Sequence, residues 1–290
     1  MTLEILYRGP LSGCNYGCQY CPFAKRTDSR QALAHDAACL DRFTDWVELR
    51  RDTVGVLFTP WGEALIRPAY QAALARLSHM PNVRRAAIQT NLSCKLDFVE
   101  RCDTQTLALW CTYHPEWVER QAFLDKAWRL HEMGARFSVG VVGFARFGQE
   151  ILALREALPQ SVYLWINAVK RELHSLSEAD RALFESVDPL YPTNTRHHPS
   201  KGRSCRAGVT SISVDGEGNA RRCHFIPAPI GNIYAPDFDE CLRERGCVNE
   251  TCHCHIGYVH LDHLRLAEVF GEGLLERIPE GDWRQASAPE

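Results

Sequence analysis

The sequence predicts an α/β fold built on a parallel β-sheet, and two observations lead to it. Over the first two-thirds of the 290 residues, short runs rich in Val, Ile and Phe alternate with segments of helical spacing. The runs are almost continuously apolar, which is typical of strands buried on both faces. An open doubly wound sheet and a partial barrel both fit this pattern. Either would place functional groups at the carboxyl ends of the strands.

Six strands are expected from runs bounded by turn residues: Leu3–Tyr7, Val54–Phe58, Ala86–Gln89, Leu107–Cys111, Phe137–Val142 and Val162–Ile166. Helices are expected over residues 36–50, 68–78, 118–133, 148–157 and 177–186. Pro68 suits a first helical turn, and Gly134 suits the position after a helix. Ser177 is a candidate N-cap, followed by Asp180. Alternating strands and helices predict a parallel sheet with helices outside it and right-handed connections.

The composition changes after Asp188. Residues 188–204 have turn and linker composition. Two further runs, residues 209–214 and 220–225, flank a glycine-rich segment and predict a β-hairpin. We therefore predict three regions: residues 1–190, residues 191–262 and a C-terminal helix and tail at 263–290.

Charge and hydropathy narrow the class of partner. The chain has 33 basic and 36 acidic residues, a net charge of −3 and no polybasic run, so neither nucleic acid nor an anionic membrane is expected as a partner. The first residues do not resemble a signal peptide, and no apolar stretch approaches the ~20 residues that span a bilayer. We expect a cytoplasmic protein, in which cysteines usually serve metals or catalysis.

Three cysteines follow the first predicted strand. Cys14, Cys18 and Cys21 are separated by three and then two residues. Three such thiolates can hold three irons of a 4Fe–4S cluster and leave the fourth iron open to a small molecule. Structural zinc typically takes four ligands in two close pairs, yet the next Cys or His residues are His35 and Cys39. The spacing therefore favours a cluster over zinc.

This spacing, with Tyr20 as the aromatic residue before the last cysteine, resembles the signature of the radical S-adenosylmethionine (SAM) superfamily. The resemblance implies a partial (β/α)6 TIM-like barrel over residues 1–190 with a small hairpin-containing iron–sulfur extension. It also implies an enzyme that binds SAM at the open iron and cleaves it reductively. The resulting 5′-deoxyadenosyl radical would then abstract hydrogen from a substrate.

Two further segments carry the resemblance. Gly62 and Glu63 follow the second predicted strand and resemble the family's Gly-Gly-Glu-Pro motif, with Trp61 and Ala64 in place of its first Gly and its Pro. A carboxylate there can hydrogen-bond an ammonium group, and the glycine allows close approach. Asn91, after the third strand, resembles part of a Thr-Asn-Gly segment, although asparagine there is often only a turn former. The other SAM-binding residues implied are Tyr20, beside the adenine, Thr112 and Asn167.

A second cysteine group resembles the SPASM or twitch extension of the same superfamily, which holds auxiliary 4Fe–4S clusters. Cys205 precedes the predicted hairpin and Cys223 ends it, so the hairpin would bring the two thiols together. We expect Cys252 and Cys254 to complete one cluster, with Cys247 as a competitor. Cys241 is expected to be structural. The alternative is zinc bound by residues from the set Cys247, Cys252, Cys254, His253 and His255.

The remaining candidates have more modest interpretations. Cys111 ends the fourth predicted strand; it either packs in the core or donates a hydrogen atom to a substrate radical, as a cysteine does in some peptide epimerases of the superfamily. Small hydrophobic thiols are expected at Cys39, Cys94 and Cys102. Solvated histidines are expected at His197, His198, His260 and His263. Aromatic residues that either line the cavity or fill the core are Trp61, Trp110, Tyr113 and Trp165.

The resemblance implies an enzyme that oxidises, epimerises or cross-links a peptide or a small polar metabolite. Flavodoxin or ferredoxin is the kind of electron donor it implies. The competing hypothesis is a non-catalytic iron–sulfur or zinc protein that acts as a scaffold or electron carrier.

Overall fold

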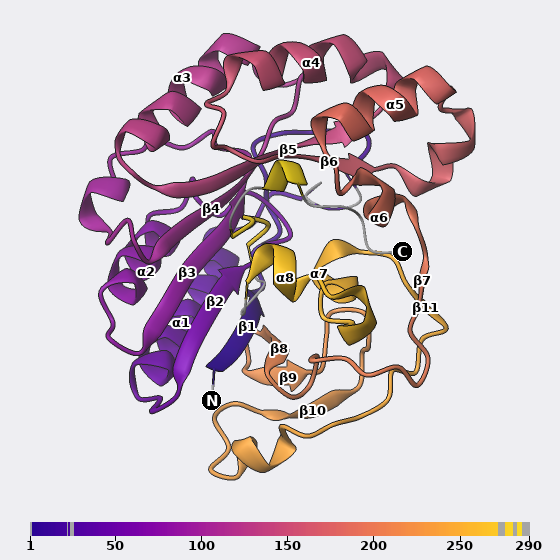
Figure 1. Cartoon of the computed structure of the whole chain (residues 1–290). Helices are drawn as coiled ribbons and strands as arrows, with labels where there is room; N and C mark the ends of the chain where they lie inside the picture. Colours follow the sequence, from indigo (N-terminus) through magenta and orange to yellow (C-terminus); the bar gives the residue numbers. More distant parts are fainter. Residues whose placement is uncertain (1, 22, 24–25, 272–275, 281–282, 286–290) are drawn as a thin grey trace.

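A nine-stranded sheet forms the centre of the molecule in a computed structural model that describes residues 2–21, 23, 26–271, 276–280 and 283–285 (Figure 1). Its strand order is β10-β9-β8-β1-β2-β3-β4-β5-β6. The six strands of the first part run parallel in chain order: β1 (Thr2–Arg8), β2 (Thr53–Phe58), β3 (Val83–Thr90), β4 (Leu107–Thr112), β5 (Arg136–Gly143) and β6 (Leu164–Ala168). The predicted α/β class with a mostly parallel sheet is confirmed.

Five helices alternate with these strands, as predicted: α1 (Arg30–Glu48), α2 (Pro68–Ser78), α3 (Arg120–Glu132), α4 (Gly148–Ala157) and α5 (Glu178–Val187). α1 begins six residues earlier than predicted because the Ser29 hydroxyl accepts the N–H of Ala32 at 3.1 Å and caps the helix there. α5 begins at the predicted cap, where Ser177 and Asp180 form a reciprocal capping box. Gly134 follows α3 with φ +68°, the left-handed conformation that favours glycine.

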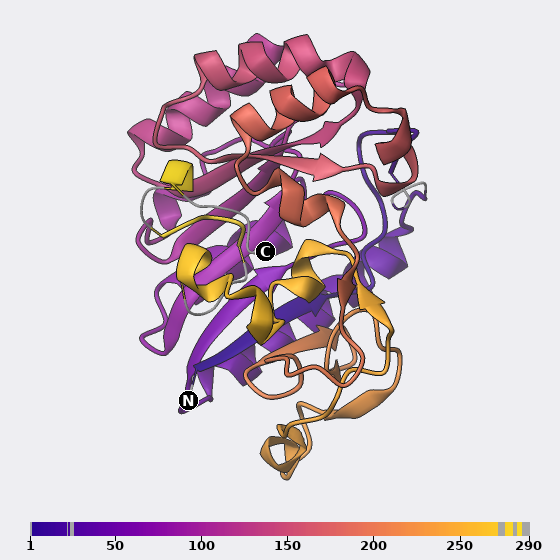
Figure 2. The ribbon, with the colours of Figure 1, turned by 45° about the vertical axis from the view of Figure 1, so that its right-hand side comes forward.

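Both faces of the sheet are covered. On one face, Ile5 and Tyr7 of β1 pack in the same core as Leu40 and Phe43 of α1. On the other, inward-facing residues of the strands pack against the C-terminal part of the chain: Leu6, Leu57, Ala87, Tyr258, Leu261 and Phe270. Figure 2 shows the yellow C-terminal segments in front of this inner face. The apolar strands predicted from sequence are therefore buried from both sides.

The predicted hairpin is present and joins the sheet. β8 (Ser211–Asp215) pairs in parallel with β1, and β9 (Asn219–Arg221) returns antiparallel to β8. Its second strand ends four residues earlier than predicted, because the chain turns away after Arg221. β10 (Pro229–Asn232) completes the edge of the sheet. Backbone pairing thus continues across the boundary predicted near residue 190.

The rest of the described chain is built from short elements. These are α6 (Tyr191–Thr195), β7 (His198–Pro199), β11 (Thr251–Cys252), α7 (His255–Tyr258) and α8 (Ala267–Phe270). Single 3₁₀ turns occur at Val99–Arg101, Ala145–Phe147, Lys170–Ser175, Phe238–Cys241, Asp262–Leu264 and Trp283–Gln285. The C-terminal helix predicted within residues 263–290 is only the four-residue α8, and residues 272–275, 281–282 and 286–290 of that region lie outside the described chain. In the described residues no helix is both long enough and apolar enough to cross a bilayer.

Buried ion pairs attach the C-terminal segment to the inner face. The Glu276 carboxylate lies 2.9 Å from Nε of Arg85 and 3.8 Å from an Nη of Arg136, near the starts of β3 and β5. The neighbouring Arg277 lies 3.9 Å from Asp188 and places its guanidinium 4.8 Å from the ring centroid of Trp165. This end of the inner face is therefore closed by the chain itself. The carboxyl ends of the strands hold the candidate site.

Candidate functional site

The three N-terminal cysteines lie in the loop that follows β1, and all three line one cavity of about 200 Å³. Cys18 is buried, while Cys14 and Cys21 are partly exposed. The Cys18 carbonyl accepts the N–H of Cys21 at 3.1 Å, which closes the turn between them. Residues from the ends of four other strands complete the cavity: Pro60, Trp61, Gly62, Glu63, Gln89, Thr90, Asn91, Trp110, Thr112, His114 and Trp165. The carboxyl ends of the strands therefore converge on the cysteine loop, as the fold class predicts.

Gly62 sits directly against the cysteine loop. A Cβ added to this glycine would lie 1.9 Å from the carbonyl oxygen of Gly13, and the N–H of Glu63 donates to the same oxygen at 3.0 Å. Only a residue without a side chain allows this approach. The turn after β2 is therefore docked on the residue that precedes Cys14.

The Glu63 carboxylate is fixed by three donors. It accepts the hydroxyl of Thr90 at 2.8 Å, the N–H of Asn91 at 2.5 Å and the N–H of Leu65 at 3.1 Å. The side chain is buried, and this burial raises the pKa of Glu63 to about 7 despite those bonds. An ammonium group bound beside it would lower that pKa and keep the carboxylate ionised.

Asn91 links the turn after β3 to the cysteine loop. Its Nδ2 donates to the side-chain oxygen of Asn15 at 3.1 Å and lies 3.9 Å from Sγ of Cys14. The next residue, Leu92, has φ 57°, which is costly for a residue with a side chain. The Lys126 ammonium helps to hold this turn, because it donates to three consecutive carbonyl groups from Leu92 onward at 2.9–3.0 Å. The positive φ gives a physical reason why the resembling family motif has glycine here.

His114 also lines this cavity, although the sequence analysis assigned it no role. Its Nδ1 lies 2.8 Å from the Tyr20 hydroxyl and 3.5 Å from Sγ of Cys18, and its ring stacks on Tyr20. Burial lowers the pKa of His114 to about 4, so the imidazole is neutral at pH 7. It therefore contacts the loop as a hydrogen-bonding group. Its position two residues beyond the end of β4 is the signal that could have identified it.

Four predicted residues are not among those that line the cavity: Tyr20, Cys111, Tyr113 and Asn167. Trp110 and Thr112 of β4 line the cavity, and because side chains alternate along a strand, Cys111 points to the opposite face, among the helices. It is fully buried there, so hydrogen donation by Cys111 does not fit its position, and packing does. Asn167 is exposed and is not among the residues that line the cavity. Tyr113 is also outside it, with its hydroxyl bonded to Glu150 at 2.7 Å.

The aromatic wall of the cavity depends on another glycine. Trp110 and Trp165 meet edge to face, with ring centroids 5.5 Å apart. A Cβ on Gly140 of β5 would lie 1.9 Å from the Trp165 ring, so this glycine makes the space that the indole fills. Trp61, half-exposed at the rim, completes the set of tryptophans predicted to face the cavity.

The late cysteines gather near the end of the hairpin. Pairing of β11 with β7 and a bridge between Lys201 and Cys247 bring their segments back beside it. Burial is the main cause that raises the thiol pKa of Cys205, Cys223 and Cys252, but mutual repulsion within the group also contributes. Cys247 contributes to the raised pKa of the Cys205 and Cys223 thiols, and Cys254 contributes to that of the Cys252 thiol. Cys247 and Cys254 are therefore both candidates for the fourth member of the group.

Cys254 is also subject to the charge of two cations that the sequence analysis missed. Arg8, which ends β1, and Lys170, which follows β6, both interact with its thiol. Arg8 donates to the Thr59 carbonyl at 2.7 Å and lies 4.1 Å from the ring centroid of Trp61. Burial lowers the pKa of Arg8 to about 10 and that of Lys170 to about 8. Cationic residues at strand ends were the available signal for both.

The predicted zinc alternative is not assembled in the described residues. The donor atoms of the late cysteines and their neighbouring histidines do not come together at the spacing of a single ion. His253 stacks on His197, whereas His255 points inward against Trp110. The predicted histidines also differ in environment, since His198 and His260 are buried rather than solvated.

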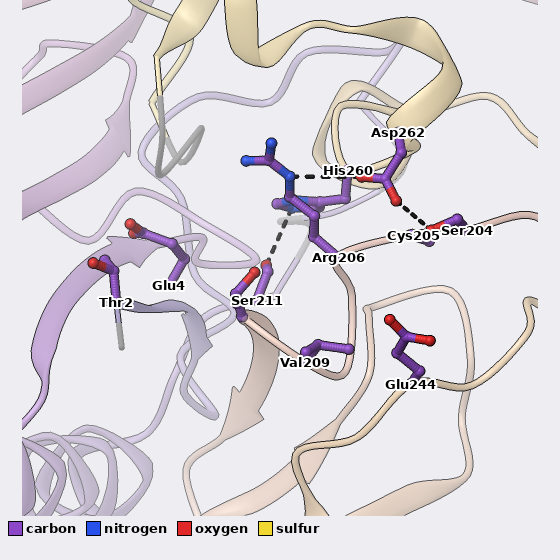
Figure 3. Close-up of a pocket in the computed structure, with 11 residues that line it drawn as sticks. Thr2, Glu4, Ser204, Cys205, Arg206, Val209, Ser211, Glu244, His260 and Asp262 are labelled. Carbon is purple, nitrogen blue, oxygen red and sulfur yellow. Dashed lines mark hydrogen bonds and ion pairs between the residues drawn. The ribbon is translucent and has the colours of Figure 1, made fainter.

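A larger hollow, of about 320 Å³, lies near the start of β1 (Figure 3). Thr2 and Glu4 line one side of it, and Arg206 and Asp262 line another. Cys205 also borders it. Burial raises the pKa of Glu4 to about 7, but Arg84 already pairs with that carboxylate at 2.8 Å. The conserved geometry of parallel sheets places function at the other strand ends, so we assign the site to the cysteine cavity.

Comparison with solved structures identifies the fold. Native anSMEcpe with bound AdoMet matches with a TM-score of 0.57 and 14% identity, over 84% of this chain and 81% of that one. The same protein with AdoMet and the Kp18Cys peptide matches with a TM-score of 0.57 and 13% identity, over the same shares. No family model and no curated protein matches the chain. The chain therefore shares its fold with anSMEcpe, a protein that was solved with bound AdoMet.

Proposed function

We propose that this protein is a radical SAM enzyme whose 4Fe–4S cluster is held by Cys14, Cys18 and Cys21. The observation that carries the proposal is the shared cavity: the three thiols line it together with Glu63 and Asn91. Its donor set fits the cofactors, because three thiolates leave one iron free for SAM, and a buried carboxylate suits the SAM ammonium. When bound, the cluster would supply the electron that cleaves SAM to a 5′-deoxyadenosyl radical.

The chain's own residues would bind and orient SAM and would shield the reacting atoms from water. Glu63 would hold the ammonium of SAM, and Gly62 would let the ligand approach the backbone beside it. Asn91 and Thr112 line the cavity and would meet its polar groups. Tyr20 does not line the cavity but lies 2.8 Å from His114, which does, and it remains our proposal for the residue beside the adenine. The tryptophan wall would exclude water from the reacting atoms.

For the second cysteine group we propose one auxiliary 4Fe–4S cluster bound by Cys205, Cys223, Cys247 and Cys252. The effects of Cys247 on the Cys205 and Cys223 thiols support this set, whereas the effect of Cys254 on the Cys252 thiol supports the pair Cys252 and Cys254 expected from sequence. Metal binding requires thiolates, and burial raises the pKa of Cys252 to about 12, so loading would release protons. We further propose the partial barrel at residues 1–190 and the cluster-binding region at 191–262, in a cytoplasmic protein.

The proposed substrate is a peptide or a small polar metabolite that is oxidised, epimerised or cross-linked. anSMEcpe has been solved with bound peptides, which supports the peptide class. The positive charges of Arg8 and Lys170 act on Cys254 and would favour a substrate with an anionic group, such as a carboxylate. Electrons would come from a flavodoxin- or ferredoxin-type donor.

Anaerobic reconstitution tests the proposal. The wild type should hold about eight irons per chain and release 5′-deoxyadenosine from SAM after reduction with dithionite. The Cys14→Ala, Cys18→Ala, Cys21→Ala triple variant should lose this cleavage and retain about four irons. Cleavage that survives in the triple variant would refute the assigned ligands.

The same reconstituted protein distinguishes the proposed enzyme from the competing function. A scaffold or electron carrier would hold iron or zinc and never cleave SAM, even with dithionite and every candidate substrate present. Replacing Cys247 and Cys254 in turn decides the auxiliary ligands. We expect Cys247→Ala to lose about four irons and Cys254→Ala to retain about eight.

A further inference from the structure

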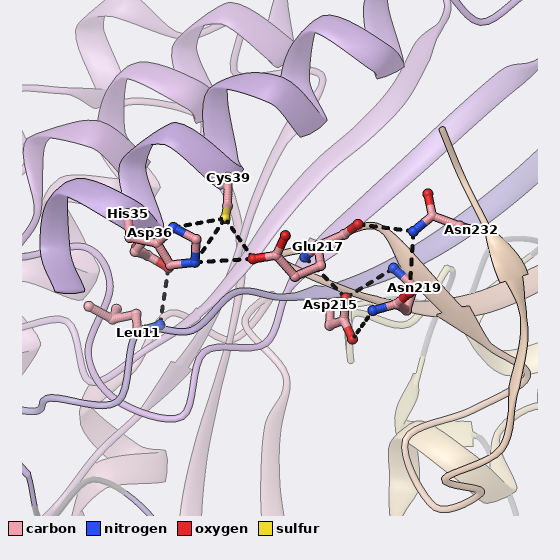
Figure 4. Close-up of polar contacts among 8 residues, drawn as sticks. All are labelled: Leu11, His35, Asp36, Cys39, Asp215, Glu217, Asn219 and Asn232. Carbon is pink, nitrogen blue, oxygen red and sulfur yellow. Dashed lines mark hydrogen bonds and ion pairs between the residues drawn. The ribbon is translucent and has the colours of Figure 1, made fainter. Parts of the chain in front are cut away.

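Three potential metal ligands meet where helix α1 approaches the turn of the β8–β9 hairpin. They are His35 and Cys39 of α1 and Glu217 of the turn (Figure 4). His35 Nε2 lies 3.1 Å from a Glu217 carboxylate oxygen, and Cys39 Sγ lies 3.7 Å from the same nitrogen and 3.9 Å from the same oxygen. None of the three belongs to either cysteine group of the proposed function.

These separations match those of ligands around one tetrahedral ion. With Zn–S at about 2.3 Å and Zn–N or Zn–O at about 2.0–2.1 Å, a tetrahedral centre holds S and N about 3.6 Å apart and N and O about 3.3 Å apart. His35 and Cys39 can reach a common ion because residues four apart lie on one face of a helix. The three atoms therefore already lie near coordination distance of one another.

The protein holds the ligands in place through other groups. The Asp215 carboxylate accepts the N–H of Glu217 at 3.1 Å, and the Asn232 amide donates to the Glu217 carbonyl at 3.0 Å. Cys39 is buried, and a Cβ on Gly216 would lie 3.3 Å from its sulfur, so the turn packs closely on the helix. Hydrogen bonds of this kind behind a ligand are typical of built metal sites.

We propose that His35, Cys39 and Glu217 bind one Zn²⁺, with solvent in the fourth position. A donor set of thiolate, imidazole and carboxylate suits zinc, whereas Mg²⁺ and Ca²⁺ prefer oxygen ligands throughout. His35 and Glu217 are exposed, so an ion can enter from solvent. The sequence analysis treated Cys39 as a small hydrophobic thiol; this proposal gives it a ligand role.

The ion would join two parts of the molecule. α1 follows the loop of Cys14, Cys18 and Cys21, and the hairpin leads to Cys223. A zinc bridge between them would fix the hairpin against the helix. It would act on the structure of both cysteine regions and does not depend on the proposed radical chemistry.

The test uses the full chain, kept reduced and under anaerobic conditions, and titrates it with Co²⁺ and Zn²⁺. The variant His35→Gln, Glu217→Gln removes two exposed ligands, and His131→Gln, Glu132→Gln is its control on the exposed end of α3. We expect the wild type and the control to bind one more equivalent of Co²⁺ than the ligand variant. Zn²⁺ should raise the melting temperature of the wild type and the control more than that of the ligand variant.

Cys39→Ser gives a spectroscopic readout of the same site. It should remove one equivalent of thiolate-to-Co²⁺ charge-transfer absorption. Equal metal equivalents in the wild type and in His35→Gln, Glu217→Gln would overturn the proposal. Because both of those side chains are exposed, that comparison holds even if Cys39→Ser fails to fold.

Discussion

Gly62 controls how close the turn after β2 comes to the cysteine loop. The Cβ of an alanine would lie 1.9 Å from a backbone oxygen of Gly13, and backbone cannot give way as a flexible side chain can. We expect Gly62→Ala to reduce SAM cleavage at least tenfold and to lower the iron content per chain. Gly148→Ala is the matched control, since its added Cβ would lie 3.6 Å from the nearest side chain. Equal activity of the two variants would contradict the assigned role.

The buried His260 should make the stability of the protein depend on pH. Its ring is buried against the Ser211 hydroxyl, and burial lowers its pKa to about 4 from the ordinary value of 6.5. The unfolded chain binds a proton there at higher pH than the folded chain, so the stability gained at neutral pH is lost as the pH falls from 6.5 to 4. When the pH falls from 6.5 to 4, the free energy of unfolding of His260→Gln should therefore decrease by about 3 kcal/mol less than that of the wild type.

Urea unfolding at pH 7 and pH 4.5 measures this difference. His131→Gln, on the exposed end of α3, serves as the control. A wild type and a His260→Gln variant with parallel pH profiles would show that His260 does not titrate as its burial implies.

At the scale of single elements, the capping box of α5 gives the sharpest expectation. The Ser177 hydroxyl accepts the N–H of Asp180, and the Asp180 carboxylate accepts the N–H of Ser177 at 3.0 Å. Ser177→Ala removes the first bond and should cost about 1 kcal/mol of stability. Chemical denaturation would report it as a lower midpoint with an unchanged slope. Ser175→Ala, three residues before the helix, provides the comparison.

The elements that the sequence predicted are those with strong local signals. Pro68, Ser177 and Gly134 each mark a helix end that the structure confirms. α1 was predicted too short, because its first two turns are exposed and only the cap at Ser29 marks their start. Pairing of β8 with β1 could not be predicted, since it joins segments about 200 residues apart and depends on tertiary contacts alone.

Local sequence signals also decided which residues of the candidate site could be predicted. Cys14, Cys18 and Cys21 follow one strand directly, and Glu63 and Asn91 follow two others, so the strand ends indicated a common location. The direction of Cys111 follows from alternation along β4, but only once the register of the strand is known. The choice between Cys247 and Cys254 depends on the folding of irregular chain, which has no periodic signal.

For the whole molecule, a buried ion pair ties the C-terminal segment to the sheet. Asp188 accepts the Tyr163 hydroxyl at 2.6 Å and the N–H of Ile166 at 2.8 Å, and it lies 3.9 Å from Arg277. Asp188→Asn would leave a buried guanidinium without its countercharge, which typically costs about 3–5 kcal/mol. We expect a clear fall in melting temperature, compared with Asp125→Asn on the exposed face of α3.

A double-variant cycle tests whether the unpaired guanidinium causes the destabilisation by Asp188→Asn. If the unpaired charge is responsible, Asp188→Asn combined with Arg277→Met should be less destabilised than Asp188→Asn alone. Additive losses in the two single variants would instead place the cost in the hydrogen bonds of Tyr163 and Ile166.

The pairing of β8 with β1 has a practical consequence for anyone who divides this chain. Ending the polypeptide near residue 190 would leave β1 as a bare edge, with its backbone groups on one side unpaired. Such edges recruit other chains and promote aggregation. The N-terminal segment is thus no self-sufficient module, and insolubility of a shortened version would say nothing against its chemistry. Expression and engineering of this protein therefore have to keep the segments before and after residue 190 together.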